Sequence, residues 1–228
     1  MQTTDTHYQQ EREFWDKKGS GDYVSLSAYD QRRLLDWLGW TGHGRVLDLG
    51  GGSGMLSRLL MMAPGSECVC LDISHNMLKY SPVPAVQANA LKLPFTDGSF
   101  NLVVAAAFLH HIPGLEDKLM RECARVLAPA GRVVGYDPNA HCIQNQIFMN
   151  DTPFRLGLFS PDERPLRPDA LSRFAMAASF SRFTFRTFSF RNERMTVFEF
   201  IQRYVLNPVS IGPLRKYLDR WFFWSASK

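Results

Sequence analysis

The middle of the chain alternates between short apolar runs and amphipathic segments. Five apolar runs of strand length lie at residues 45–49, 68–73, 85–89, 99–108 and 132–137. Apolar residues at helical spacing lie between them, and we expect helices at residues 54–62, 74–81 and 115–127. Strands that are apolar on both faces form parallel sheets covered by helices. The pattern therefore predicts an α/β fold with a doubly wound, mostly parallel sheet.

Two helices are expected before the first strand. The polar N-terminus is predicted to be helical as far as Lys18, because the glycines of Gly19–Gly21 stop a helix there. Residues 28–38 place leucines on one helical face and charged residues on the other, which predicts a second, amphipathic helix.

The regular alternation of predicted strands and helices ends in the last third of the chain. Residues 139–166 contain three prolines and are expected to be irregular. Residues 168–178 begin with a proline and predict a helix. Phenylalanines alternate along residues 181–190 with one change of phase, which is typical of a strand with a bulge.

Helices are expected at residues 196–206 and 213–220. The sequence leaves two alternatives for the final residues, "WFFWSASK". They extend the preceding helix through an apolar stripe, or they form a closing strand.

The composition is that of a globular protein. Hydrophobic residues make up 45% and charged residues 21%, and no run approaches the roughly 20 apolar residues of a membrane span. The polar, acid-containing N-terminus resembles neither a signal nor a transit peptide, so we expect a cytoplasmic protein. The cysteines lack metal-ligand spacing, and we expect reduced structural thiols and no metal site; they are Cys68, Cys70, Cys123 and Cys142.

The positive charge is concentrated near the C-terminus. Residues 151–228 hold 13 Lys/Arg against 7 Asp/Glu, together with 12 of the 17 phenylalanines. One interpretation is an arginine-rich surface over an aromatic core. The other is a lid that favours an anionic or aromatic ligand.

Four glycines fall within the nine residues of "VLDLGGGSG", residues 46–54. A phosphate-binding P-loop is excluded because Met55, not lysine, follows the last glycine. The dinucleotide fingerprint fits poorly, since Gly54 comes one position early. The carboxylate of Asp48 would repel a pyrophosphate but attract a cationic ligand.

This loop resembles the first motif of class I S-adenosylmethionine-dependent methyltransferases. "CLDIS" is similar to the second motif of the family, "ANALKLPFTDGSFNLVVAAAFLHHI" to the third and fourth, and "RECARVLAPAGRVVGYDPN" to the segment that follows them. The resemblance covers residues 45–139. It implies a Rossmann-like sheet of seven strands that ends in an antiparallel hairpin, with residues 181–190 and 221–227 as the last two strands.

The resemblance also implies a division of the chain. Residues 1–44 would be an N-terminal helical lid, residues 45–138 the cofactor-binding core, and residues 139–228 the substrate-side insertions with the last two strands.

S-adenosylmethionine is the cofactor that the resemblance implies. Asp72 would bind the ribose hydroxyls, and Asn89, in place of the usual aspartate, would accept a hydrogen bond from the adenine amino group. Asp48 would lie near the ammonium group through water, or else hold loop amides. The full expected set is Asp48, Gly50, Gly51, Gly52, Asp72, Ile73, Met77, Asn89, Ala90 and Ala106.

Two adjacent histidines are the candidates for catalysis. His110 and His111 follow the fourth strand at the sheet edge where ligands bind. We favour His111 as a general base, while the alternative is that "LHHI" only packs or caps a loop. Asp137 and Tyr23 are expected to contact substrate, and Tyr8, Trp15 and Tyr23 to close over the cofactor.

The predicted function is methyl transfer to a small molecule, with a hydroxyl oxygen of a natural product or glycoconjugate precursor as the expected acceptor. N- or C-methylation is the alternative within the same class. A non-catalytic cofactor-binding module and an NAD-dependent oxidoreductase are the alternatives from other classes. No nucleic-acid partner is expected, and the oligomeric state stays open.

Overall fold

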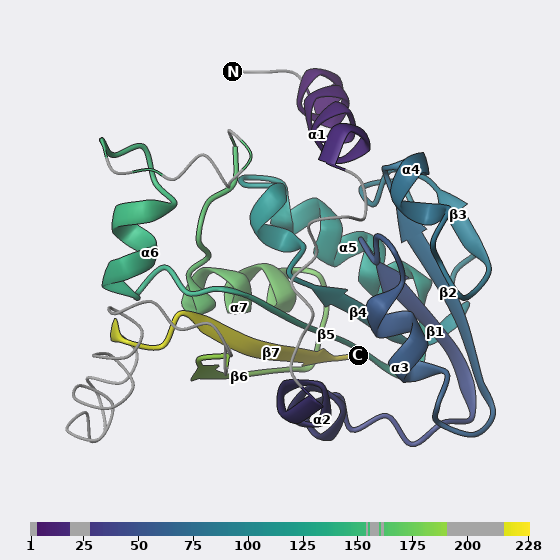
Figure 1. Ribbon diagram of the computed structural model, residues 1–228. Coiled ribbons are helices and arrows are strands. Elements are labelled where there is room, and N and C mark those ends of the chain that lie inside the picture. Colours follow the sequence, from purple (N-terminus) through teal and green to yellow (C-terminus); the bar gives the residue numbers. More distant parts are fainter. Residues whose placement is uncertain (1–3, 19–27, 154, 156–159, 161, 191–216) are drawn as a thin grey trace.

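One seven-stranded sheet organises the molecule (Figure 1). The structure is a computed structural model that describes residues 4–18, 28–153, 155, 160, 162–190 and 217–228. The strands are β1 (Gly44–Leu49), β2 (Ser66–Asp72), β3 (Ala85–Gln87), β4 (Phe100–Ala106), β5 (Leu127–Pro138), β6 (Arg182–Phe188) and β7 (Trp221–Ser227). Their spatial order is β3-β2-β1-β4-β5-β7-β6.

The first five strands are parallel, and β7 lies antiparallel between β5 and β6. This arrangement confirms the predicted α/β fold with its antiparallel C-terminal hairpin.

Helices cover both faces of the sheet (Figure 1). They are α1 (Thr4–Lys18), α2 (Ala28–Leu38), α3 (Met55–Leu60), α4 (His75–Leu78), α5 (Glu116–Val126), α6 (Ile143–Phe148) and α7 (Pro168–Ala177), with a short 3-10 helix η2 (Leu109–His111). α5 and α7 pack on one face, whereas α2 and α3 pack on the other.

Side chains along a strand point alternately to the two faces, and β1 shows why its apolar run is continuous. Leu47 and Leu49 belong to the core beneath α5, while Val46 belongs to the core beneath α2 and α3. All three side chains are fully buried. The doubly wound arrangement therefore follows from a strand whose buried part, residues 46–49, is apolar at every position except Asp48.

β6 differs from its prediction. Its register against β7 is continuous from Arg182 to Phe188, so the expected bulge was wrong. The alternation of phenylalanines changes phase without a bulge, because Phe183 packs on one face of the sheet and Phe188 on the other. Phe190 lies beyond the end of the strand.

The closing residues 221–227 form β7, which decides between the two alternatives left open for them. A strand wins because these residues pair with β5 on one side and β6 on the other. The helix expected at residues 196–206, and residues 213–216 of that expected at 213–220, lie outside the described residues. Residues 217–220 are described and are not α-helical.

Two further boundaries depart from expectation. α6 lies inside the stretch predicted to be irregular. β5 begins at Leu127, directly after α5, and not at residue 132 as expected. Within the segments that the structure describes, no helix combines the length and apolarity needed to cross a bilayer.

Candidate functional site

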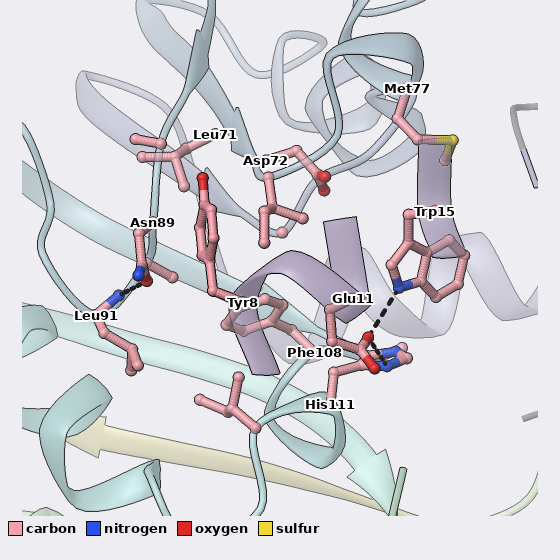
Figure 2. A pocket seen from close by; sticks show the side chains of 16 residues that line it. Tyr8, Glu11, Trp15, Leu71, Asp72, Met77, Asn89, Leu91, Phe108 and His111 are labelled. Carbon is pink, nitrogen blue, oxygen red and sulfur yellow. Dashed lines mark hydrogen bonds and ion pairs between the residues drawn. The ribbon is translucent and has the colours of Figure 1, made fainter. Parts of the chain in front are cut away.

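A pocket opens where β1, β2 and β4 end. The space within it, including the part open to solvent, is about 770 Å³. The residues around it are shown in Figure 2. They are Tyr8, Glu11, Trp15, Gly50, Leu71, Asp72, Ile73, Met77, Ala88, Asn89, Ala90, Leu91, Ala107, Phe108, His111 and Ile112.

The glycine loop after β1 forms one wall of this pocket. The amides of Gly50 and Gly51 donate hydrogen bonds to the Leu71 carbonyl at 2.7 and 3.1 Å, which ties the loop to the end of β2. Gly50 has φ +69°, and a Cβ there would lie 2.2 Å from Cδ2 of Phe108. Glycine is required at this position because both the backbone conformation and the close ring exclude a side chain.

Asp72 presents a carboxylate at the end of β2. Its Oδ2 accepts from the Gly52 amide at 2.9 Å and its Oδ1 from the Ser74 amide at 2.8 Å. Burial raises the pKa of this carboxyl group, and the hydrogen bonds from Ser74 and Gly52 oppose that effect. A carboxylate has about four lone-pair positions, so each oxygen keeps capacity for a hydroxyl of a ribose.

Mostly apolar residues line the part of the pocket where we expect the adenine of the cofactor. Ile73, Met77 and Ala90 line the pocket near Asp72, and Met77 is fully buried. Asn89 also lines the pocket, and its Oδ1 accepts from the Leu91 amide at 2.8 Å (Figure 2). An amide oxygen has two lone pairs, so Oδ1 retains one for a donor on the ligand. The residues present therefore fit a nucleoside with a ribose diol.

Asp48 lies outside the pocket lining. Its Oδ2 accepts two hydrogen bonds from Ser57, one from the amide at 2.9 Å and one from the hydroxyl at 2.6 Å, at the start of α3. Burial raises the pKa of Asp48 to about 6, against the lowering effect of the Ser57 bonds. In this structure Asp48 therefore holds the amide and the hydroxyl of Ser57 in the first turn of α3.

Three other residues expected to bind the cofactor also lie outside the pocket lining. Gly51 packs against Asp48, because a Cβ at Gly51 would lie 2.7 Å from the carboxylate. Gly52 contributes its amide to Asp72. Ala106 ends β4, while the next residue, Ala107, lines the pocket.

His111 lies in the pocket between two carboxylates. Its Nδ1 is 3.2 Å from Oε1 of Glu163 and 3.4 Å from Oε2 of Glu11. All three residues are buried. Burial lowers the pKa of the imidazole, but the hydrogen bond to Glu11 and the charges of Glu163 and Glu11 outweigh it, so the pKa is raised overall.

His110 points away from the pocket into the core. Its Nδ1 lies 2.9 Å from Oδ1 of Asp137, and the other oxygen of Asp137 accepts from the Trp224 indole at 2.9 Å. Burial is the main cause of a lowered pKa for His110, and the charge of His111 adds to it. Asp137 is fully buried, and with His110 it lies outside the pocket lining.

The N-terminal helix α1 covers the pocket. Tyr8, Glu11 and Trp15 all face it (Figure 2). The ring of Trp15 meets His111 edge-on with a centroid distance of 5.2 Å. The expected substrate residue Tyr23 lies outside the described residues.

Sequence reasoning missed several residues of this pocket. Glu11 is an ordinary acid in a polar helix, and Glu163 lies in a stretch without periodicity. Phe108 was assigned to a strand, although it follows the end of β4. Ala107 has φ +51°, a strained conformation that often marks functional sites, but no sequence pattern reveals it.

Comparison with known families identifies one domain. Residues 47–135 match a family described as "Methyltransferase domain". The ubiquinone/menaquinone biosynthesis C-methyltransferase UbiE of Ectopseudomonas mendocina is 40% identical over 103 residues, which are 40% of this chain and 40% of that protein. The chain therefore spans about two fifths of the length of this curated relative.

Solved structures share the whole fold. A SAM-dependent methyltransferase from Archaeoglobus fulgidus superposes with a TM-score of 0.67 at 18% identity, covering 99% of this chain and 100% of the other. Phosphoethanolamine N-methyltransferase 2 of Haemonchus contortus, in complex with S-adenosyl-L-methionine, gives 0.66 at 18% identity over 99% of this chain and 57% of the other. At these identities the likeness shows the fold alone.

Proposed function

We propose that this chain, which belongs to the class I S-adenosylmethionine-dependent methyltransferases, methylates a small molecule with an ionisable hydroxyl group. The observation that carries the proposal is a single pocket with Asp72 at one side and His111 at the other. One residue suits a ribose diol and the other suits a proton transfer. The cytoplasm is the compartment that we propose.

The cofactor would be held by the ends of β1, β2 and β3. Asp72 would accept from the ribose hydroxyls, and Ile73 and Met77 would flank the adenine. Asn89 would accept from the adenine amino group with its remaining lone pair. Asp48 would act indirectly, since it holds the start of α3 behind the glycine loop.

S-adenosylmethionine supplies a methyl carbon that the sulfonium has already activated. The chain therefore has to align the acceptor and to exclude water, and orientation alone contributes roughly 7–11 kcal/mol to such reactions. Tyr8 and Trp15 on α1 cover the pocket and would exclude water. His111 would take the proton that the acceptor hydroxyl loses, a contribution of about 10²–10⁴-fold.

The atom of the acceptor that receives the methyl group is either an oxygen or a carbon. A hydroxyl oxygen is the acceptor predicted from the sequence, whereas the relative UbiE is a C-methyltransferase. Loss of a phenolic or enolic proton raises the reactivity of both the oxygen and the adjacent ring carbon. His111 as a base fits either outcome, so a phenol-like acceptor is consistent with both observations.

A transfer assay tests this proposal. The purified chain would be incubated with methyl-labelled S-adenosylmethionine and a panel of phenols, sugars and amines, and products would be identified by NMR. An O–CH₃ or ring C–CH₃ resonance supports the proposal and decides between the two positions. Methylation of amines alone would contradict it.

Calorimetric titration with S-adenosylhomocysteine and NAD provides the control on cofactor identity. We expect binding of S-adenosylhomocysteine and none of NAD. Binding of S-adenosylhomocysteine without turnover over the whole panel would favour a non-catalytic cofactor-binding module instead.

A further inference from the structure

We propose that Glu11 and Glu163 are positioning residues that fix the orientation and tautomer of His111, and that Glu11 makes this orientation depend on the docking of α1. The inference rests on the proposed role of His111 as a base. Neither carboxylate lies within residues 47–135, where the family resemblance is found.

Three distant segments bring these groups together. His111 comes from η2 after β4, Glu11 from α1, and Glu163 from the segment between α6 and α7. Both carboxylates face the same ring nitrogen, Nδ1, at 3.2 and 3.4 Å. A carboxylate accepts but cannot donate, so a neutral imidazole held this way carries its proton on Nδ1 and leaves the Nε2 lone pair to accept a proton.

Ser160 keeps both carboxylates in place. Its hydroxyl donates to Oε1 of Glu11 at 2.7 Å, and its amide donates to Oε1 of Glu163 at 3.1 Å. Ser160 is itself fully buried. The Arg164 amide donates to the His110 carbonyl at 3.1 Å, which ties this segment to η2. The arrangement follows the logic of catalytic histidines that a buried carboxylate orients.

Glu11 extends this arrangement to α1, the helix that covers the pocket. α1 is held at the opposite side of the pocket by Asp16, whose Oδ1 accepts from the Ser74 hydroxyl at 2.6 Å and the Asn76 amide at 3.3 Å. Release of α1 would remove the Glu11 carboxylate from His111 as it opens the pocket. The base is therefore complete only when the pocket is covered.

The charges around His111 predict how a substitution should change the pKa of its imidazole. Glu11 and Glu163 raise the pKa of the imidazole, burial lowers it, and Asp137 on β5 raises it further. The other neighbours are His110 on η2 and Asp72 on β2. Removing one adjacent carboxylate charge should lower the pKa of His111, because the imidazolium loses a partner.

The test is direct titration of the imidazole by ¹⁵N-resolved NMR. Glu163→Gln keeps the shape of the side chain and removes its charge, and Glu163 lies outside the pocket lining. Glu13→Gln makes the same change at an exposed position on α1 and serves as the matched control. We expect Glu163→Gln to lower the pKa of His111 by at least about 0.5, and Glu13→Gln to leave it unchanged.

The tautomer provides a second readout that does not depend on activity. At a pH where His111 is neutral, the wild type should show a protonated Nδ1, and this preference should weaken in Glu11→Gln and Glu163→Gln. An unchanged pKa and tautomer in both variants would overturn the proposal. So would stoichiometric uptake of Zn²⁺ or Mn²⁺ by the wild type, because the donor atoms of His110, His111 and Glu163 lie within 4.8 Å of one another.

Kinetics separate this proposal from the proposed function. With an acceptor in hand, kcat should fall about tenfold in Glu163→Gln with KM unchanged, and the rise of kcat with pH should move to lower pH. Loss of both carboxylates should approach the full 10²–10⁴-fold contribution of a general base. If no acceptor is methylated while the NMR changes occur, the proposed function fails and the positioning role stands.

Discussion

The buried carboxylate of Asp48 should make the stability of the protein fall between pH 4 and pH 6. Its pKa rises from 3.8 to about 6 on folding, mainly through burial. The folded state therefore keeps a proton that the unfolded chain has already released over this range. At about 1.4 kcal/mol per pKa unit, Asp48 contributes stability below pH 4 on the order of 3 kcal/mol that is lost by pH 7.

Asp48→Asn isolates this contribution, because asparagine has nearly the same shape and does not titrate. Urea unfolding followed by tryptophan fluorescence at pH 4, 5, 6 and 7 gives the free energy of unfolding of each protein. The variant should become more stable relative to the wild type by about 3 kcal/mol between pH 4 and pH 7. Asp36→Asn, on the exposed side of α2, should show no such trend.

A substitution of Ser57 provides a second check on the contribution of Asp48. The Ser57 hydroxyl donates to the charged form of Asp48 at 2.6 Å, so Ser57→Ala should reduce stability by about 1–3 kcal/mol at pH 7 and by less at pH 4. A stability difference between wild type and Asp48→Asn that stays constant within 0.5 kcal/mol, on the order of the measurement error, would refute the reasoning.

Three further outcomes are expected. Asp72→Asn should weaken S-adenosylhomocysteine binding in calorimetry by about ten- to a hundredfold, since hydrogen bonds to a charged group are worth about 1.5–3 kcal/mol; unchanged affinity in a folded variant would exclude the ribose role. Gly50→Ala should lower the Tm by at least about 5 °C through its overlap with Phe108, whereas Gly114→Ala, with φ +80° but no neighbour within 4 Å, should cost less. Asn89→Asp should retain or tighten cofactor binding, and a large loss would contradict its place beside the adenine.

The sequence predicted those features that depend on neighbours in the chain. Continuous apolar runs such as that of β1 specify strands buried on both faces, and a glycine loop beside Asp72 specifies a ligand at the sheet edge. Ser74 precedes α4 and caps it, because its hydroxyl accepts from the Met77 amide at 3.2 Å. The apolar run, the glycine loop and the cap each involve residues only a few positions apart, and parallel strands bring the loop and Asp72 to the same edge of the sheet.

Features that depend on distant partners could not be predicted in the same way. The apolar residues within 221–227 are compatible with a helix or with a strand. Only the pairing with β5 and β6 determines that they form a strand. Glu11 and Glu163 become notable only because folding buries both beside His111. Asp48 could face the ligand or hold loop amides, and the presence of Ser57 within reach of its carboxylate gives it the second contact.

The position of β7 between β5 and β6 has a consequence for how the protein folds during synthesis. β5 presents its open side to β7, and the register joins Val133 to Ala226. A nascent chain therefore exposes the unpaired backbone of β5 until β7, which comes much later in the sequence, has also been synthesised. Long-range pairing of this kind is slow to form, and an uncovered strand edge invites association with other chains. Truncation within β7 should lead to aggregation during expression rather than to a shorter soluble protein.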